Sequence, residues 1–290
     1  MAHELGLEQA RQRFRTALAR RRGALVGTPL RDVYTGSYGE ATVAQATTFW
    51  GARMQVVLPE LVSCEIHAHG LIEPALTALL IEVANERSVV YDVGAHIGYY
   101  SVLARARGAT VHAFEPSRDT LEVLLDNVPD DVVVAGMGLW SEETSLRFQD
   151  FGPRHSAVNT FLSPKDENLA EPELTYDVGV TTIDRYVERT GDVPTIVKID
   201  AEGAELQVLQ GGETTIRKTQ PLITLEVGDT SSSRTSRGAV ELALELGYVA
   251  YELTGGGLHP HVLGDAYGYG NLVMVPRSAP PPLPTGLSPL

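Results

Sequence analysis

Hydrophobic positions along the chain follow two alternating periods. Between residues 89 and 275, β-branched runs of four to six residues alternate with segments whose apolar residues recur every three or four positions. Such runs are typical of strands buried on both faces, and the segments between them are typical of covering helices. The pattern predicts a mostly parallel sheet with helices on both faces. The expected strands are 89–93, 110–114, 132–135, 195–200, 222–227, 248–253 and 271–275, the last two as an antiparallel pair.

The segments outside this alternation divide the chain into four expected parts. Residues 1–40 form a basic helix and a connection, 41–87 an extension that covers a ligand site, 88–277 the main α/β domain, and 278–290 a proline-rich tail. An insertion at 140–182 interrupts the main domain with strand-like pieces at 145–148, 159–162 and 176–182. Two further strands are expected at 54–58 and 61–66, and the expected helices lie at 8–22, 72–83, 118–127, 183–189, 205–209 and 239–246.

Composition and charge exclude several classes of protein. With 43% hydrophobic residues, the 290-residue chain can bury a large core. No apolar run is long enough for a membrane span, and the N-terminus lacks the order of a signal peptide. The single cysteine, Cys64, allows no internal disulfide, so we expect a cytoplasmic protein. The net charge of −14 would repel phosphate backbones, so we expect no nucleic-acid partner.

The positive charge gathers at the N-terminus. Residues 1–31 carry seven arginines against Glu4 and Glu8, a balance of +5, so the remaining residues carry −19. The basic segment 8–22 is amphipathic. We interpret it as a helix packed on the acidic body or on a second subunit, which would give a homo-oligomer. The alternative, contact with an anionic membrane, is less favoured because so short a segment binds membranes weakly.

A glycine-containing turn follows the first strand of the main domain. Its sequence is Asp92-x-Gly94-x-His96-x-Gly98, between a strand and a helix. Gly94 can adopt backbone angles closed to other residues, and Gly98 lets the backbone come close to a neighbour or a ligand. The turn also directs helix N–H groups at whatever lies above the strand end. This arrangement is typical of a nucleotide-binding turn.

A carboxylate ends the second strand. Glu115 follows Gly94 by 21 residues, close to the spacing at which an acid accepts ribose hydroxyls. A dinucleotide-binding turn needs a further glycine where this chain has His96, because the pyrophosphate touches backbone there. A nucleoside cofactor without a pyrophosphate does not need it. We therefore expect S-adenosylmethionine, with Asp92 placed to meet its ammonium group or a bridging water.

Charged residues gather after the fourth strand. The block 198–205 contains a lysine and three carboxylates at the sheet edge where α/β proteins bind ligands. Asp200 is expected to face the reactive group of the cofactor, because a cationic sulfonium is stabilised by a nearby carboxylate. For Lys198 with Glu202 or Glu205, a structural ion pair that caps a helix N-terminus is the competing interpretation.

Five motifs together resemble the FkbM-type methyltransferases. Their order and spacing match across residues 54–276, and the most specific is the 198–205 block. The motifs are Gly70 to Pro74, Asp92 to Gly98, Phe114 to Pro116, Val180 to Asp184, and Lys198 to Glu205 followed by Leu225-Glu226. The chain departs from the family at His96, where asparagine is usual.

This resemblance implies a Rossmann-like class I fold, a seven-stranded sheet, and O-methylation of a sugar, polyketide or other specialised metabolite. By the same resemblance, Glu73 would line the methionine end, Glu115 the ribose and Asp200 the site of methyl transfer. The expected cofactor-contacting positions are Glu73, Asp92, Gly94, Ala95, His96, Gly98, Tyr100, Ser101, Glu115, Pro116, Ser117, Leu139, Trp140 and Asp200.

Methyl transfer to an alcohol benefits from a general base. His155, in the insertion, is the first candidate because insertions cover the strand edge, and Asp200 is the second. Asp200, Glu202 and Glu226 could gather around Mg²⁺, but no metal ligand is assigned and a metal is not favoured.

Two alternative functions remain. A nicotinamide-dependent oxidoreductase or epimerase would need the missing glycine, and the chain offers no Tyr-x-x-x-Lys pair. A non-catalytic module that binds an adenosyl ligand and a protein partner is the other. The small-molecule, hydroxylated acceptor is the partner we expect in the enzymatic interpretation.

Overall fold

A computed structural model of the chain describes residues 5–24, 34–35, 37, 40–162, 171–229, 235–254 and 257–278. Most of the expected connection before residue 40, and all of the proline-rich tail after residue 278, lie outside the described residues.

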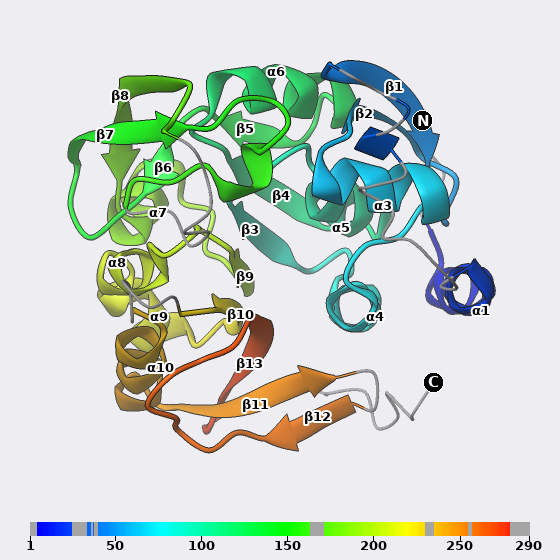
Figure 1. Cartoon of the computed structure of the whole chain (residues 1–290). Coiled ribbons are helices and arrows are strands. Elements are labelled where there is room, and N and C mark those ends of the chain that lie inside the picture. Colours follow the sequence, from blue (N-terminus) through cyan, green and yellow to red (C-terminus); the bar gives the residue numbers. More distant parts are fainter. Residues whose placement is uncertain are drawn as a thin grey trace.

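An eight-stranded sheet forms the centre of the molecule (Figure 1). Five neighbouring strands are parallel. The three strands nearest the C-terminus extend this sheet at one edge by antiparallel pairing. The order across the sheet is β12 (Gly257–Pro260), β11 (Tyr248–Thr254), β13 (Gly270–Pro276), β10 (Leu222–Val227), β9 (Ile196–Ile199), β3 (Val89–Val93), β4 (Thr110–Phe114) and β5 (Val133–Ala135). All seven expected strands are confirmed, and β12 adds an eighth at the edge.

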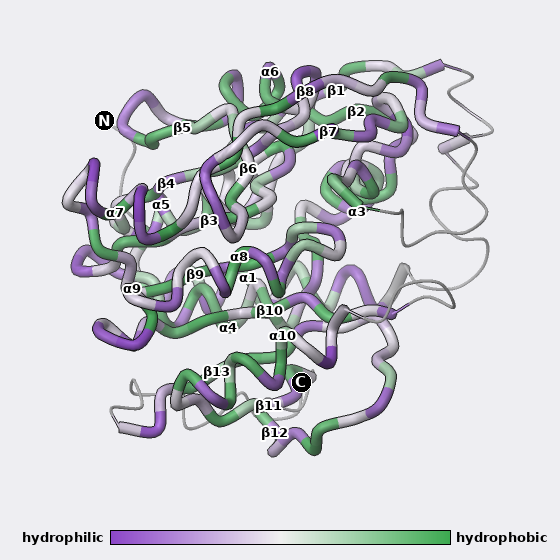
Figure 2. Tube along the Cα trace, turned by 90° about the vertical axis from the view of Figure 1, so that its left-hand side faces the viewer, coloured by the Kyte–Doolittle hydropathy of each residue, from purple (hydrophilic) through white to green (hydrophobic). Residues whose placement is uncertain are grey.

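Helices cover both faces of the sheet, as expected. One buried core lies beneath α4 (Pro74–Val83), α5 (Tyr99–Ala106) and α6 (Arg118–Asn127). The other lies beneath α7 (Ile183–Thr190), α8 (Glu205–Gln210), α9 (Glu213–Thr219) and α10 (Ser236–Glu245). Figure 2 shows hydrophobic residues following central strands such as β10, which is buried along its whole length.

The N-terminal part packs on the first of these cores. It consists of α1 (Leu7–Ala24), an antiparallel hairpin of β1 (Thr42–Thr47) and β2 (Arg53–Leu58), and α3 (Leu61–His69). The strand expected at 61–66 is wrong, because that segment is the helix α3. The Glu60 carboxylate accepts hydrogen bonds from the first-turn N–H groups, and Gly70 ends the helix in a left-handed conformation.

The N-terminal helix is held by apolar and ionic contacts. Phe14 and Leu18 are buried against the body. Arg11 pairs with Glu82, and the Nε of Arg21 lies 3.1 Å from Glu65. The basic helix therefore packs on acidic residues of its own chain, and its expected role in a homo-oligomer stays a prediction.

A chain of aromatic rings connects α1 with α5. Successive ring centroids lie 5.8 Å apart from Phe14 to Phe49, 4.8 Å from Phe49 to Trp50 and 5.2 Å from Trp50 to Tyr99. Tyr100 follows, with its ring centroid 5.2 Å from that of Tyr99. Edge-to-face pairs of this kind stabilise packing beyond the area they bury.

The insertion forms a separate three-stranded sheet in the order β6 (Gly138–Leu139), β8 (Leu174–Thr181) and β7 (Thr144–Asp150). The strand expected at 159–162 is wrong: Thr160 makes only an isolated bridge with Gln149. A short 3₁₀ helix, η1 (Ser156–Val158), precedes it. Residues 163–170 lie outside the described part of the chain.

Among the described residues, no single helix is both long and apolar enough to cross a membrane, although α3 and α4 meet that criterion as a pair bent by 70°.

Candidate active site

A cavity of about 740 Å³ opens at the carboxyl ends of the central parallel strands. The turn after β3, the end of β4, the loop after β9, and residues from α1, α3 and the insertion all line it. Its size is in the range of small-molecule sites. Open α/β sheets bind ligands at this edge, so this cavity is the candidate active site.

The glycine turn brings two strand ends into close contact. Gly94 has φ +71°, and a Cβ atom there would lie 1.8 Å from the carbonyl oxygen of Asp200. Gly98 has φ +89°, and a Cβ atom there would meet Leu124 at 2.6 Å. Both positions therefore require glycine, as the sequence predicted, and the turn fits tightly between β9 and α6.

Glu115 is buried beneath the same turn. Its carboxylate accepts hydrogen bonds from the backbone N–H of His96 at 2.8 Å and of Ser117 at 2.9 Å. Burial raises the pKa of Glu115 to about 7, although these hydrogen bonds and Lys198 act in the opposite direction. A carboxylate has about four acceptor positions, so two remain for the hydroxyls of a ribose.

A buried lysine connects the turn with the strand ends. The Nζ of Lys198 donates to the carbonyl oxygen of Gly94 at 3.1 Å and lies 3.2 Å from Asp92 and 3.3 Å from Asp200. Burial alone would lower the pKa of Lys198, but the carboxylates of Asp200, Asp92 and Glu73 raise it. The lysine therefore remains charged and orients the two aspartates.

Glu73 enters the site from the N-terminus of α4. Its carboxylate accepts hydrogen bonds from Tyr100 at 2.8 Å, from Asn271 at 2.6 Å and from Tyr269 at 3.4 Å. Burial, and then the charge of Asp200, raise its pKa. The residue joins α4 to β13, two elements far apart in sequence.

His96 joins the turn to the insertion. It adopts a left-handed backbone conformation, φ +51°, which histidine and asparagine tolerate better than most other non-glycine residues. Its Nε2 lies 2.8 Å from the Ser156 hydroxyl, and its buried Nδ1 has no hydrogen-bond partner among the described residues. Burial lowers the pKa of His96, which keeps the imidazole neutral near pH 7.

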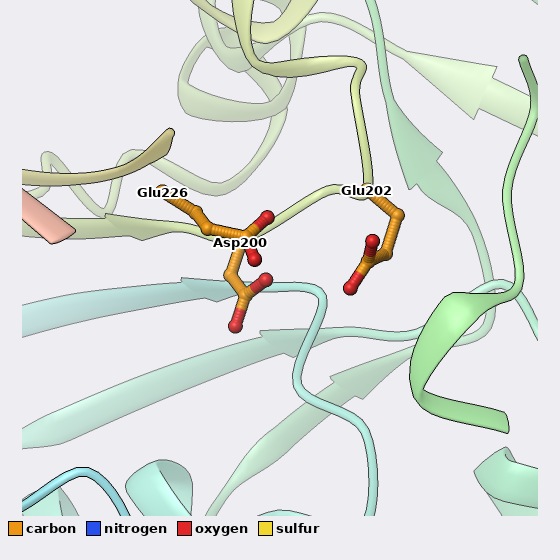
Figure 3. A group of neighbouring side chains, drawn as sticks. All are labelled: Asp200, Glu202 and Glu226. Atoms are coloured by element: carbon orange, nitrogen blue, oxygen red, sulfur yellow. The ribbon is translucent and has the colours of Figure 1, made fainter. Parts of the chain in front are cut away.

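Three carboxylates gather at the ends of β9 and β10. Each of Asp200, Glu202 and Glu226 has an oxygen within 4.8 Å of the others. Figure 3 shows the carboxylate of Glu202 turned toward those of Asp200 and Glu226. Oxygen ligands of this kind suit Mg²⁺ as well as the hydroxyls of a substrate.

The structure brings most of the expected site residues to one cavity. Those that line it are Glu73, Gly94, Ala95, His96, Tyr100, Glu115, Pro116, Leu139 and Asp200. Asp92 lies behind the wall, where it accepts a hydrogen bond from Ser101 at 2.6 Å. Ser117 donates to Glu115, and the Trp140 ring contacts Phe161. His155 is not among the described lining residues, but its neighbour Ser156 is.

Sequence reasoning did not assign Lys198, Arg21 and Tyr269 to the site. For Lys198 the sequence left an ion-paired structural role open, and the structure gives it contacts to both Asp92 and Asp200. Arg21 and Tyr269 also line the cavity. Their distance in sequence from the motifs left no signal for them. Glu205 instead accepts backbone hydrogen bonds from Ala201 and Gly203, which supports its structural role.

Residues 92–253 match the family described as the methyltransferase FkbM domain. This region is more than half of the chain and contains the glycine turn, Glu115 and the lysine block.

Comparison with individual proteins gives partial matches. The hexuronic acid methyltransferase AglP of Haloferax volcanii is 33% identical over 144 residues, which cover 48% of this chain and 56% of AglP. An FkbM methyltransferase structure from Methylobacillus flagellatus KT is 20% identical, with a TM-score of 0.43, over 66% of this chain and 44% of that chain. A precorrin-6y C5,15-methyltransferase from Geobacter metallireducens is 15% identical, with a TM-score of 0.37, over 69% and 83%. The chain therefore spans about half the length of AglP.

Proposed function

The chain belongs to the FkbM methyltransferase family, and we propose that it transfers the methyl group of S-adenosylmethionine to a hydroxyl of a sugar or a similar polyhydroxylated metabolite. It is a methyltransferase with a Rossmann-like α/β fold. The nicotinamide alternative is not retained, because the family fixes the enzyme class.

The chemistry of the cavity wall is the main support for this proposed function. Asp200, Glu202 and Glu226 present carboxylates in one place, and such groups accept hydrogen bonds from vicinal hydroxyls. Tyr269 is 73% exposed and also lines the cavity, so its ring offers an apolar surface at the opening. An acceptor with several hydroxyls and an apolar ring face matches this combination. The name of AglP, a hexuronic acid methyltransferase, supports a sugar.

The residues of the turn fit the cofactor. Glu115 accepts ribose hydroxyls with its two remaining acceptor positions. The carboxylate of Glu73, near Tyr100 and Lys198, receives the ammonium of the methionine part. When bound, S-adenosylmethionine supplies an electrophilic methyl group on a sulfonium.

Asp200 is the residue we assign to the acceptor oxygen. Its carboxylate lies at the strand end, 3.3 Å from the Nζ of Lys198, which orients it. Asp200 would take the proton of the acceptor hydroxyl as that oxygen gains the methyl group and the methyl–sulfur bond of the sulfonium breaks, which leaves S-adenosylhomocysteine. His155, the first candidate base from the sequence, is the alternative; it does not line the cavity in the described part of the chain, but its neighbour Ser156 does.

Methyl transfer from labelled S-adenosylmethionine to a panel of sugars and polyketide alcohols tests the function. Asp200→Asn should lower kcat about 100-fold or more and change affinity for S-adenosylhomocysteine less than threefold. Asp177→Asn is the matched control, because Asp177 is 68% exposed on β8. If the protein binds S-adenosylhomocysteine but methylates nothing in the panel, the non-catalytic module replaces this proposal.

Metal dependence is tested with the same assay. In this proposal Asp200, Glu202 and Glu226, the acidic trio, contact hydroxyls of the acceptor, and Lys198 supplies the positive charge. EDTA should therefore leave turnover unchanged. Activity that disappears with EDTA and returns with Mg²⁺ would instead assign the trio to a cation.

A further inference from the structure

The charges that line the cavity are strongly unequal. Six carboxylates line it: Glu65, Glu73, Glu115, Asp200, Glu202 and Glu226. Only two cationic side chains, Arg21 and Lys198, do so among the described residues. Lys198 is fully engaged, since it contacts Gly94, Asp92 and Asp200. Arg21 is therefore the one cation of the described wall that is available to an acceptor.

Arg21 is held in place by one side of its guanidinium. Its Nε donates to Glu65 at 3.1 Å, and its side chain is 22% exposed. Across the described part of the chain, its two terminal nitrogens make no hydrogen bond. Glu65 belongs to α3, whose Leu61 and Val62 also line the cavity. The terminal nitrogens of an arginine oriented in this way suit the two oxygens of a carboxylate or phosphate.

Arg21 lies on a different wall from Asp200 and Glu226, although Glu65 pairs with Arg21 and Lys198 pairs with Asp200. Arg21 comes from α1, and Asp200 and Glu226 come from the ends of β9 and β10. In Figure 1, α4 stands between α1 and these strand ends. An anionic group would be attracted to the α1 wall and repelled from the acidic trio. Both effects favour the same orientation of the acceptor, with its hydroxyls toward Asp200.

We propose that the acceptor carries an anionic group, a carboxylate or a phosphate, which Arg21 binds at the α1 wall while a hydroxyl of the same molecule lies at Asp200. This inference rests on the proposed methylation of a hydroxyl. It adds that the substrate is negatively charged and that Arg21 recognises this charge.

The test compares matched acceptors of different charge. Methyl transfer is measured with glucose, glucuronate and glucose 1-phosphate, in the wild type and in Arg21→Gln, Arg21→Lys and Arg20→Gln. Arg20 is the neighbouring arginine, exposed on the same helix and not part of the cavity wall. Glucuronate against glucose 1-phosphate distinguishes the carboxylate from the phosphate.

The wild type should use one of the acidic acceptors with kcat/KM about 10- to 100-fold above glucose, and Arg21→Gln should lose that advantage through KM. Arg21→Lys should keep part of it, and Arg20→Gln all of it. Equal use of glucose, or a preference that persists in Arg21→Gln, overturns the inference and leaves the proposed function intact.

A binding measurement keeps the two proposals separate if no sugar is methylated. Calorimetry with glucuronate and glucose 1-phosphate on the S-adenosylhomocysteine complex should show binding to the wild type and to Arg20→Gln, and none to Arg21→Gln. Binding in this pattern without turnover would contradict the proposed function alone. If neither anion binds the wild type more tightly than glucose does, the role of Arg21 is contradicted.

Discussion

We propose that the buried carboxylate of Glu115 makes cofactor binding depend on pH. Its pKa is raised to about 7 by burial, so the group is protonated below that pH and ionised above it. Only the ionised form can accept hydrogen bonds from two hydroxyls while it also accepts two backbone N–H groups. In this proposal, cofactor binding removes the proton when the pH is below 7.

We expect affinity for S-adenosylhomocysteine to fall about tenfold between pH 8 and pH 6. Calorimetry at several pH values, in buffers of different ionisation enthalpy, would show the released proton. The pKa of His96 is lowered by burial, which favours the neutral imidazole. Glu73, whose pKa is also raised, is the other titrating group near the cofactor.

The control is Glu115→Gln. This variant should bind the ligand more weakly at pH 8, by about 1 to 3 kcal/mol, and with a much smaller pH dependence. An unchanged pH dependence in Glu115→Gln would assign the titration to Glu73 instead.

Among single residues, the sequence predicted the site residues that directly follow strands. It missed those that reach the cavity from other parts of the chain. Gly94, Glu115 and Asp200 each end a buried β-branched run, and parallel strands bring such ends to one edge. Arg21 and Tyr269 reach the cavity from α1 and from the loop before β13. Their positions depend on packing across the whole chain, for which no local pattern exists.

At the scale of elements, the contact between the β3 turn and the end of β9 can be tested with one methyl group. Gly94→Ala would place its Cβ 1.8 Å from the Asp200 carbonyl, in a backbone conformation with φ +71°. The strain and the collision together should destabilise the fold by about 3 kcal/mol or more. Thermal unfolding should show a clearly lower melting temperature, and S-adenosylhomocysteine binding should be lost.

Gly179→Ala is the matched control for that substitution, because a Cβ atom there meets nothing within 4 Å. It should change the melting temperature by little. Equal behaviour of the two variants would mean that the turn is not tightly fitted.

The sheet was predicted well because its strands have a strong local hydrophobic pattern. Short segments outside the sheet were predicted less well. The strand β10 begins and ends where the β-branched run does. The segment 61–66 has the same apolar composition, but six residues are too few to separate a strand from a helix by period. The carboxylate of Glu60 and the left-handed Gly70 decide for the helix.

For the molecule as a whole, α1 behaves as part of the core. Phe14 is 4% exposed and begins the aromatic chain that ends at Tyr100 in the cavity wall. Phe14→Ala should therefore lower the free energy of unfolding by about 3 to 5 kcal/mol, measured in urea. Thr16→Ala, exposed on the same helix, should change it by less than about 0.5 kcal/mol.

A separate transition for α1, with the main transition unchanged in Phe14→Ala, would contradict this. From the sequence we expected an amphipathic helix packed on the acidic body or on a second subunit. The helix does pack on the acidic body. The sequence could not predict that the helix supplies a wall of the cavity, because that depends on how α1 lies across α3 and α4.

The intrinsic tryptophan fluorescence of the protein can also report on the aromatic chain and on the cavity. The two tryptophans lie on different sides of the site: Trp50 is buried within the chain of rings, and Trp140 contacts Phe161, which lines the cavity. Trp140 emission should respond to a ligand entering the cavity, whereas Trp50 emission should report the packing of α1 and the hairpin. Replacing either indole with phenylalanine would turn fluorescence into separate readings of occupancy and of the N-terminal scaffold.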